Sequence, residues 1–406
     1  MIAVRRTLVT ATLILGSAAC VKPAAVAVPT DTSGSFLYVW TESADTAKRA
    51  AFISVIDLRA GSPDAGKVVR AVYAGPGSRS VHHTEHSIPA DGLLFANDFG
   101  TGRTYIYDMN KPGEPRVAAS FGTAGPFGWP HSYARLPNGN RLATYQWQST
   151  KFNTPPGGIA EVRPDGSVVR WVSAATADAE DREITPYSLE VIPSLDRAVS
   201  TTTSMIEDTG VHVQIWRISD LTLLHTLRIP ASTHAKHGPD SIPHHMLPGE
   251  PRLLSDGRTV MMGTFMCGVF IVTGIDTPAP GLKEVHAFPG ESCAMPVVTG
   301  NYWIQTVPEL RAVVALDVSD PANPREVSRV VYEGLKPHWL AGDLSGRRLV
   351  MNAGSPKDPN LYLIDFDPAT GALTRNMRFE SLSVAAVDVP GIGTVKGVPH
   401  GAVFSR

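Results

Sequence analysis

The stretch "HSYARLPNGNRLATY" (131–145) alternates apolar and polar residues on both sides of an Asn138-Gly139 turn. Alternation with period two predicts half-buried β-strands, and Asn-Gly between two such runs predicts a tight hairpin. Two later stretches align with it without gaps, "YSLEVIPSLDRAVST" (187–201) and "HWLAGDLSGRRLVMN" (338–352). The same hairpin therefore recurs along the chain, which is typical of repeat architectures.

A second type of hairpin recurs even more regularly. Each copy is an alternating apolar strand, a reversal rich in Gly, Pro or Asp, and another strand. The copies are residues 52–73, 104–121, 158–172, 213–229, 268–288, 313–331 and 361–379. Their spacing of roughly 45–60 residues is about one propeller blade. We therefore predict an all-β fold, a seven-bladed β-propeller over residues 36–406, in which each copy forms the outer pair of strands of its blade.

The two ends of the chain are predicted to meet in one blade. The first outer hairpin is preceded by "FLYVW" (37–41) but by no inner strand, whereas "VPHGAVFSR" (398–406) reads as an inner strand with no partner after it. We predict that residues 399–405 supply the innermost strand of the first blade. A ring closed in this way has no exposed sheet edge of the kind that invites aggregation.

Ten of the 13 histidines lie at the starts of the predicted inner strands or in the loops that lead to them. Innermost strands of a propeller begin at the same mouth of the central channel, so these side chains should converge. Neutral imidazoles gathered in one place suit a transition metal. We predict a metal site, with copper as the first choice and iron or zinc as alternatives. Its candidate ligands are His82, His83, His86, His131, His244, His245, His338 and His400.

The individual roles within "VHHTEH" (81–86) stay open. In a regular strand His82 and His86 share one face and His83 lies on the other, so the three cannot ligate equivalently. The alignment favours His83, with His82 or His86 as a second ligand or a supporting residue. Tyr187 replaces histidine in its blade, and is a candidate either to orient a bound oxygen species or to bond the backbone as a channel-lining tyrosine.

Five further residues have two readings each. His234 and His237 lie in the loop before the fourth inner strand, where they either cap the metal or are solvated. Cys293 and Met295 either add a soft ligand that favours copper or pack in the channel. Cys267 and Cys293 are either a disulfide or two small buried hydrophobic residues.

The N-terminus is typical of an exported protein. "MIAVRR", "TLVTATLILG" and "SAAC" supply the charge, the apolar segment and the small-residue cleavage site of a secretory peptide. Cys20 after small residues resembles a bacterial lipobox, in which this cysteine is lipidated, although Ser17 stands where leucine is usual. We predict a signal peptide of the lipoprotein type over 1–20 and a flexible tether over 21–35. The mature chain is then expected in the periplasm or outer cell envelope of a bacterium, held to the membrane only by its lipid.

Charge argues against one class of partner. The chain has 36 Lys and Arg against 38 Asp and Glu. It therefore lacks the basic excess that phosphate backbones require, and no nucleic acid partner is expected.

Four motifs resemble the selenium-binding protein / methanethiol oxidase family. They are "HHTEH", "PHSYARLPNGNRLATY", "SMIEDTGVHVQIWRISDLTLLHTL" and the terminal "PHGAVFSR". The resemblance implies a β-propeller that holds copper on channel histidines and, in bacteria, oxidises methanethiol to formaldehyde, sulfide and peroxide in the periplasm. Carried over residue by residue, it implicates His82, His83, His131 and His400.

One departure and one competing resemblance qualify what the first resemblance implies. Family members usually carry a cysteine-rich stretch after the paired histidines, and "TEHSIPADGLLFANDF" has none, so covalent selenium binding is not expected. A weaker resemblance is to the propeller of nitrous oxide reductases, which also opens an inner strand with paired histidines. Its third histidine is one residue nearer to the pair than His86 is here.

Two functions follow as hypotheses. The first is an exported copper-dependent oxidoreductase, similar to methanethiol oxidase, that acts on a small sulfur compound such as a thiol with O₂. The second is a propeller that binds a protein or polymer of the cell envelope without catalysis, since propellers host unrelated functions. Metal content and thiol-dependent O₂ consumption distinguish them.

Overall fold

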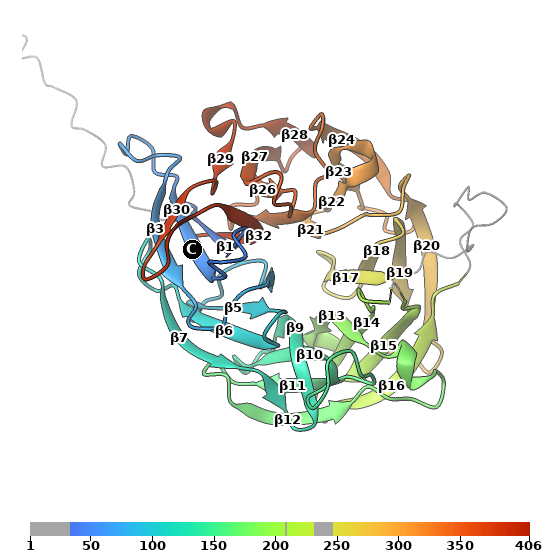
Figure 1. The fold of residues 1–406 in the computed structure, drawn as a ribbon. Helices are drawn as coiled ribbons and strands as arrows, with labels where there is room; N and C mark the ends of the chain where they lie inside the picture. Colours follow the sequence, from blue (N-terminus) through green and yellow to red (C-terminus); the bar gives the residue numbers. More distant parts are fainter. Residues whose placement is uncertain (1–32, 208, 231–246) are drawn as a thin grey trace, which may run out of the picture. The chain divides into compact units, whose positions relative to one another are not determined.

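The computed structural model describes residues 33–207, 209–230 and 247–406. In this part of the chain seven sheets follow one another around a ring, as Figure 1 shows. The helical elements among the described residues are four three-residue 3-10 turns, at Asp181–Glu183, Pro193–Leu195, Pro308–Leu310 and Met377–Phe379. The predictions of an all-β fold and of a seven-bladed propeller are confirmed.

Each blade is an antiparallel sheet of four main strands, described here from its inner to its outer strand. The first three blades consist of β32 (Gly397–Phe404), β1 (Phe36–Ser43), β2 (Ala51–Asp57) and β3 (Val68–Tyr73); β4 (Val81–Thr84), β5 (Leu93–Asp98), β6 (Arg103–Asp108) and β7 (Arg116–Phe121); and β9 (Phe127–Arg135), β10 (Arg141–Gln148), β11 (Gly158–Val162) and β12 (Val168–Ser173). A short strand, β8 (Thr123–Ala124), pairs with β9.

The other four blades follow the same order. They consist of β13 (Pro186–Ile192), β14 (Arg197–Thr202), β15 (His212–Arg217) and β16 (Thr222–Arg228); β17 (Pro248–Leu253), β18 (Val260–Thr264), β19 (Gly268–Thr273) and β20 (Gly281–Ala287); β21 (Pro296–Thr299), β22 (Tyr302–Val307), β23 (Ala312–Asp317) and β24 (Arg325–Val331); and β25 (Trp339–Gly342), β26 (Arg348–Asn352), β27 (Asn360–Asp367) and β28 (Ala372–Arg375). β29 (Leu382–Ser383) pairs with β27, and β30 (Val387–Val389) pairs with β31 (Gly393–Val395). The recurring hairpins of the sequence are the outer pairs of all seven blades.

Strands from the two ends of the described chain close the ring. β32 pairs with β1 in antiparallel register, from Leu37 opposite Phe404 to Ser43 opposite Gly397. The backbone N–H of Gly34 also donates to the carbonyl of Ser405 at 2.8 Å. The predicted closure is confirmed, and backbone contacts with the ring begin slightly before residue 36.

Apolar side chains fill the spaces between neighbouring blades. Tyr38 and Trp40 of the first blade pack with Leu94 and Tyr107 of the second, and all four are buried. The Trp40 indole N–H donates to the carbonyl of Asn97 at 2.8 Å, which satisfies its one polar atom. Successive side chains of a strand point to opposite faces of its sheet, and the sheets pack face to face. The alternating apolar residues of the sequence therefore form this core.

Polar side chains join neighbouring blades close to the channel. In five blades a residue of the second strand donates a hydrogen bond to a backbone carbonyl at the inner strand of the next blade. The donor and carbonyl pairs are Asn97 to His131 (3.0 Å), Thr144 to Tyr187 (2.8 Å), Thr201 to Gly249 (2.8 Å), Thr306 to His338 (2.9 Å) and Asn352 to His400 (2.7 Å). Four of these carbonyls belong to predicted site residues, so the ring itself fixes their backbone.

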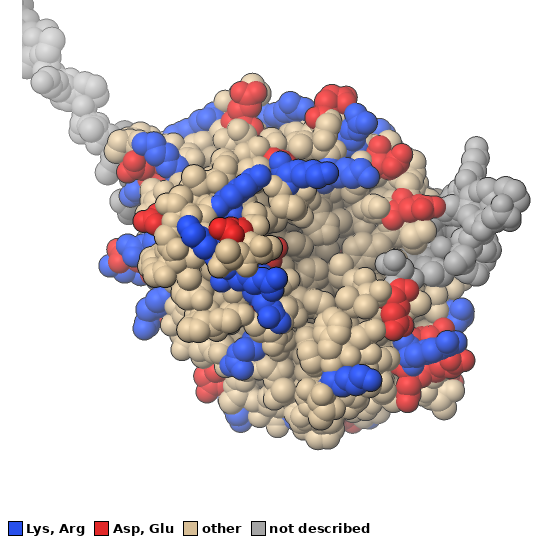
Figure 2. Space-filling view, viewed as in Figure 1, with Lys and Arg blue, Asp and Glu red and all other residues tan. Residues whose placement is uncertain are grey.

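Charged side chains of both signs are interspersed over the face viewed in Figure 2. No helix among the described residues has the length and apolar character needed to cross a bilayer. The signal peptide, most of the tether and Cys20 lie outside the described residues and stay predictions, as do His234, His237, His244 and His245.

Candidate metal centre

The paired histidines of β4 lie in a β-bulge. Val81 pairs with Asp98 and Thr84 pairs with Ala96, so two residues, His82 and His83, oppose the single residue Asn97. A bulge interrupts the strict alternation of side chains between the two faces of a strand. The two rings accordingly stack with their centroids 4.2 Å apart. The expectation that His82 and His83 face opposite sides is wrong, because it assumed a regular strand.

The same bulge recurs on the inner strand of four other blades. In each case two consecutive residues oppose one residue of the second strand. These pairs are His131 and Ser132, Tyr187 and Ser188, Gly249 and Glu250, and His400 and Gly401. The same β-bulge therefore positions side chains from five blades at the channel.

Three histidines form the centre of the cluster. One ring nitrogen from each of His82, His83 and His131 lies within 4.8 Å of the other two, so the three could hold a metal ion. His400 adjoins them, with its ring centroid 5.0 Å from that of His82. His338 lies one step further, 5.0 Å from the ring of His400. The described inner strands thus bring five of the predicted ligands together.

His86 lies apart from the three central histidines. Its ring stacks on Trp339 at 4.9 Å, with an angle of 2° between the planes. Its Nε2 accepts a hydrogen bond from Arg252 Nη2 at 2.7 Å. Because that lone pair is used, His86 fits the supporting role left open by the sequence better than the role of a ligand.

Several imidazole nitrogens of the cluster lack hydrogen-bond partners among the described residues. His131 Nδ1 donates to the carbonyl of Tyr187 at 2.7 Å, which leaves the lone pair on Nε2. Nε2 of His131, Nε2 of His82 and Nδ1 of His400 are all buried with no hydrogen-bond partner among the described residues. Each such atom costs about 1–3 kcal/mol, so several in one place indicate a ligand site. Imidazole nitrogens of this kind fit copper, zinc or iron.

The histidines of the cluster are neutral at pH 7. Burial lowers the pKa of His131 and of His338 to about 4. Burial, together with repulsion from neighbouring histidines, holds the pKa values of His82, His83 and His400 well below the usual 6.5. A neutral imidazole is the form that binds a metal.

Tyr187 lies against two of the histidines. Its hydroxyl is 3.3 Å from His83 Nε2, and its ring centroid is 4.1 Å from that of His131. The side chain is fully buried, and burial raises its pKa well above 10, so it stays a neutral phenol. The hydroxyl thus faces the cluster, as the first of its two readings requires.

Glu250 is a residue of the site that the sequence analysis missed. It occupies the bulge of β17 and is 3% exposed, and its Oε1 lies 3.6 Å from His83 Nδ1. Burial alone would raise its pKa, but the Arg252 guanidinium and His86 lower it below the ordinary value, so it is ionised. Aligning the Asp256-Gly257 turn with Asn138-Gly139 would have placed Glu250 beside the position of His131.

The sulfur residues pair or pack in this structure. Cys267 and Cys293 form a disulfide, which is the first of their two readings. Met295 is buried in an apolar cluster with Ile304 and Trp339. The donor set of the described site is therefore nitrogen-rich rather than thiolate-containing.

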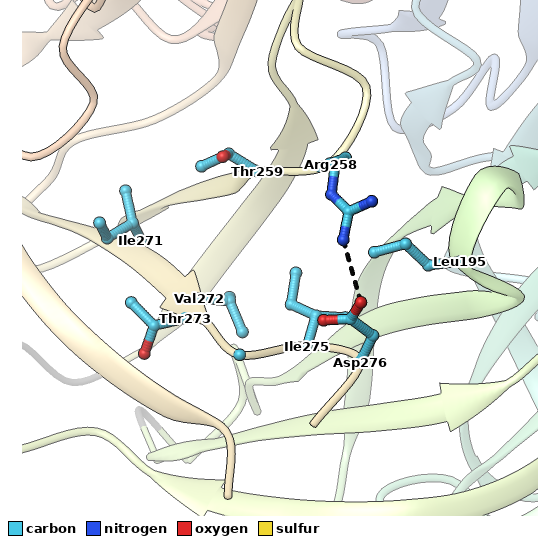
Figure 3. A pocket seen from close by; sticks show the side chains of 9 residues that line it. Leu195, Arg258, Thr259, Ile271, Val272, Thr273, Ile275 and Asp276 are labelled. Carbon is cyan, nitrogen blue, oxygen red and sulfur yellow. Dashed lines mark hydrogen bonds and ion pairs between the residues drawn. The ribbon is translucent and has the colours of Figure 1, made fainter. Parts of the chain in front are cut away.

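A separate pocket of about 280 Å³ lies between the fourth and fifth blades, as Figure 3 shows. Leu195, Ile271 and Ile275 line it beside an ion pair between Arg258 and Asp276 at 3.0 Å. It contains none of the predicted site residues.

Glu42, whose carboxylate contacts the first residue of β4, should make the stability of the protein depend on pH. Burial raises the pKa of Glu42 to about 7, although its Oε2 accepts the backbone N–H of Val81 at 3.0 Å. Between about pH 4.5 and 7 the folded chain binds a proton at Glu42 that the unfolded chain does not, so this group lowers stability as pH rises. Glu42→Gln should therefore be more stable than the parent at pH 8, by a few degrees in Tm, and similar to it at pH 5.

Thermal melts of both proteins from pH 5 to 9 check this prediction. Parallel Tm curves for the parent and Glu42→Gln would contradict it, because a titrating Glu42 must make the two curves diverge above pH 5.

Comparison with known proteins supports the fold and leaves the activity open. No protein-family model matches the chain, and no curated protein matches it. Among solved structures it is similar to a hypothetical selenium-binding protein from Sulfolobus tokodaii, with a TM-score of 0.69 and 14% identity over 92% of this chain and 94% of that one.

Two further solved structures carry different names. One is a periplasmic gluconolactonase from Pseudomonas aeruginosa, with a TM-score of 0.61 and 16% identity over 91% of this chain and 99% of that one. The other is a putative 6-phosphogluconolactonase from Bacteroides fragilis, with a TM-score of 0.58 and 12% identity over 93% and 100%. At these identities the likeness establishes a shared propeller fold.

Proposed function

We propose that this chain is an exported copper-dependent oxidoreductase that oxidises a small thiol with O₂. The observation that carries the proposal is the convergence of His82, His131 and His400 around His83, each with a buried imidazole nitrogen that has no hydrogen-bond partner among the described residues. The similarity to a structure named as a selenium-binding protein supports it, as does the resemblance of the sequence motifs to that family.

The chain's own residues would hold and shield the metal. His82, His83, His131 and His400 would be its ligands. The hydrogen bond from Asn97 Nδ2 to the His131 carbonyl fixes the backbone of one of them. Bound copper would supply one-electron redox chemistry and a Lewis acid. Tyr187 offers a neutral hydroxyl beside His83, where it can orient an oxygen atom by a hydrogen bond.

The overall reaction balances with water as the second co-substrate. Methanethiol, O₂ and water would give formaldehyde, hydrogen sulfide and hydrogen peroxide. The thiol loses two electrons, O₂ takes up two electrons and two protons to become peroxide, and water supplies the carbonyl oxygen. We propose that this occurs in the periplasm or outer envelope, on a chain anchored through lipidated Cys20.

The proposal is tested on protein exported in the presence of copper. We expect bound copper, and O₂ consumption on addition of methanethiol with peroxide and sulfide formed in equal amounts. Gluconolactone serves as a comparison substrate, since two similar structures are named as lactonases. Copper-free protein that consumes no O₂ would overturn the proposal and favour the non-catalytic binding module, whereas hydrolysis of gluconolactone alone would point to a lactonase.

A further inference from the structure

The two carboxylate oxygens of Glu250 have different surroundings. Oε2 accepts hydrogen bonds from Ser188 Oγ at 2.5 Å and from Arg252 Nη1 at 2.9 Å. Oε1 is buried and has no hydrogen-bond partner among the described residues. His83 Nδ1 lies 3.6 Å from it, with both side chains 2% exposed. One oxygen thus anchors the side chain, and the other faces a histidine of the cluster.

Packing alone does not account for this placement. A buried carboxylate oxygen without a partner is costly, because that oxygen has left water and has gained no hydrogen bond in return. Ser188 belongs to the bulge of β13, and Arg252 follows Glu250 on β17, so two blades hold the carboxylate in its orientation. Ser188 and Arg252 thus hold Oε2, while Oε1 lies beside His83 without a hydrogen bond.

We propose that Glu250 is a positioning residue that accepts the Nδ1–H of His83 and so keeps the lone pair of that ring on Nε2. The distance of 3.6 Å is longer than a hydrogen bond, and a shift of under about 1 Å closes it. Histidines that bind a metal generally donate their other ring N–H to a carboxylate or a carbonyl. The inference rests on the proposed function for its effect on copper, but the tautomer of His83 can be measured without metal.

The arrangement parallels that of His131 and adds a charge. His131 Nδ1 donates to a neutral carbonyl of Tyr187, whereas His83 faces an anion. Four neutral imidazoles carry no charge to offset a divalent cation. Oε1 of Glu250 places partial negative charge beside His83, while Arg252 pairs with the other oxygen. We expect Glu250→Gln to weaken copper binding by about 10- to 100-fold.

A double-mutant cycle tests whether Glu250 acts through His83. Copper affinity is measured by chelator competition for the parent, Glu250→Gln, His83→Ala and the double variant. The loss on Glu250→Gln should be large in the parent and small in the His83→Ala background, because the partner is already gone. An equal loss of copper affinity in both backgrounds would overturn the proposal, because Glu250 would then be a ligand or a general structural residue. No loss in either background would overturn it as well.

Glu161→Gln is the matched control. Glu161 is also a buried carboxylate, 3% exposed, and it pairs with Arg170 on an outer strand at 2.7 Å. Glu161→Gln should leave copper affinity unchanged, even though it removes an ion pair of a buried carboxylate as Glu250→Gln does. A similar loss in both variants would mean that the effect is loss of structure, and would count against a positioning role.

NMR of metal-free protein with ¹⁵N-labelled histidine separates this inference from the proposed function. His83, assigned by comparison with His83→Ala, should be protonated on Nδ1 in the parent and should change tautomer in Glu250→Gln. That result supports the positioning role even if copper does not bind and the proposed function falls. A parent His83 protonated on Nε2 overturns the inference even if copper binds.

Discussion

Alanine in place of His131 should lower copper affinity by more than about a hundredfold, beyond the range typical of residues in the second layer. His131 is fully buried, its Nδ1 donates to the Tyr187 carbonyl, and its Nε2 has no hydrogen-bond partner among the described residues. Nε2 of His131 is therefore available to bind a metal. The same change at His83 or His400 should have a comparable effect, whereas loss of His338 should matter less because it lies one ring further out.

The measurement is copper content and affinity after identical export, with His225→Ala as the control. His225 lies on the outer strand β16, opposite Ile215, away from the inner strands. Losses from two cluster histidines should not add, because the second removal meets a site already broken. Equal copper in all variants would rule out the metal site.

Stability distinguishes a lost ligand from a lost fold. Removing His131 also removes a buried nitrogen without a partner, so the metal-free variant should melt within a few degrees of the metal-free parent. A variant that loses both copper and its melting transition would have failed to fold. His131→Gln, which keeps more of the side-chain volume, then replaces it in the comparison.

The fold could be predicted because its signals are local and repeated. Alternation and turn residues specify each hairpin within about 20 residues, and seven copies leave few other architectures. The position of the closing strand followed from an imbalance, since residues 52–73 lacked an inner strand and residues 398–406 lacked a partner. These inferences needed no knowledge of side-chain packing.

The geometry of the site could be predicted only in part. That histidines converge follows from where the inner strands begin, but their rotation about the strand does not. His82 turns toward His83 because two residues oppose Asn97, and such a register shift depends on a partner strand and not on local alternation. Glu250 was not predicted for another reason. It is the second residue of its bulge, where the third and fourth blades have Ser132 and Ser188, so comparing the histidines alone does not reveal it.

The pairing of the two cysteines illustrates a similar limit. Cys267 and Cys293 are 26 residues apart, and that spacing alone is compatible with a bond or with two buried thiols. The bond forms because the turn after β18 and the segment before β21 come together in space, with 5.0 Å between the Cα atoms. Only the arrangement of neighbouring blades supplies that information.

Deleting residues 398–406 should prevent the ring from forming a stable propeller. Ala402 and Val403 are fully buried and Phe404 is 4% exposed. Val403 packs with Tyr38 and Trp40, whereas Phe404 packs in the cluster of the seventh blade with Trp339. Each large apolar side chain of this kind is worth about 1.5–3 kcal/mol, and a whole protein has only about 5–15 kcal/mol of stability.

The deletion also breaks the polar contacts that join the last blade to the first. Trp339 Nε1 donates to the Ala402 carbonyl at 3.0 Å, and Asn352 Nδ2 donates to the His400 carbonyl at 2.7 Å. Without β32 both donors lose their acceptors and β1 becomes an exposed sheet edge, so we expect aggregation or loss of a cooperative melt. His400→Ala is the matched control, because it removes a candidate ligand and keeps the strand. A truncated chain that stays soluble with the parent's Tm would show that the ring does not depend on its closing strand. In His400→Ala we expect loss of copper with an unchanged melting transition. That result would separate the role of β32 in ring closure from its role in the metal site.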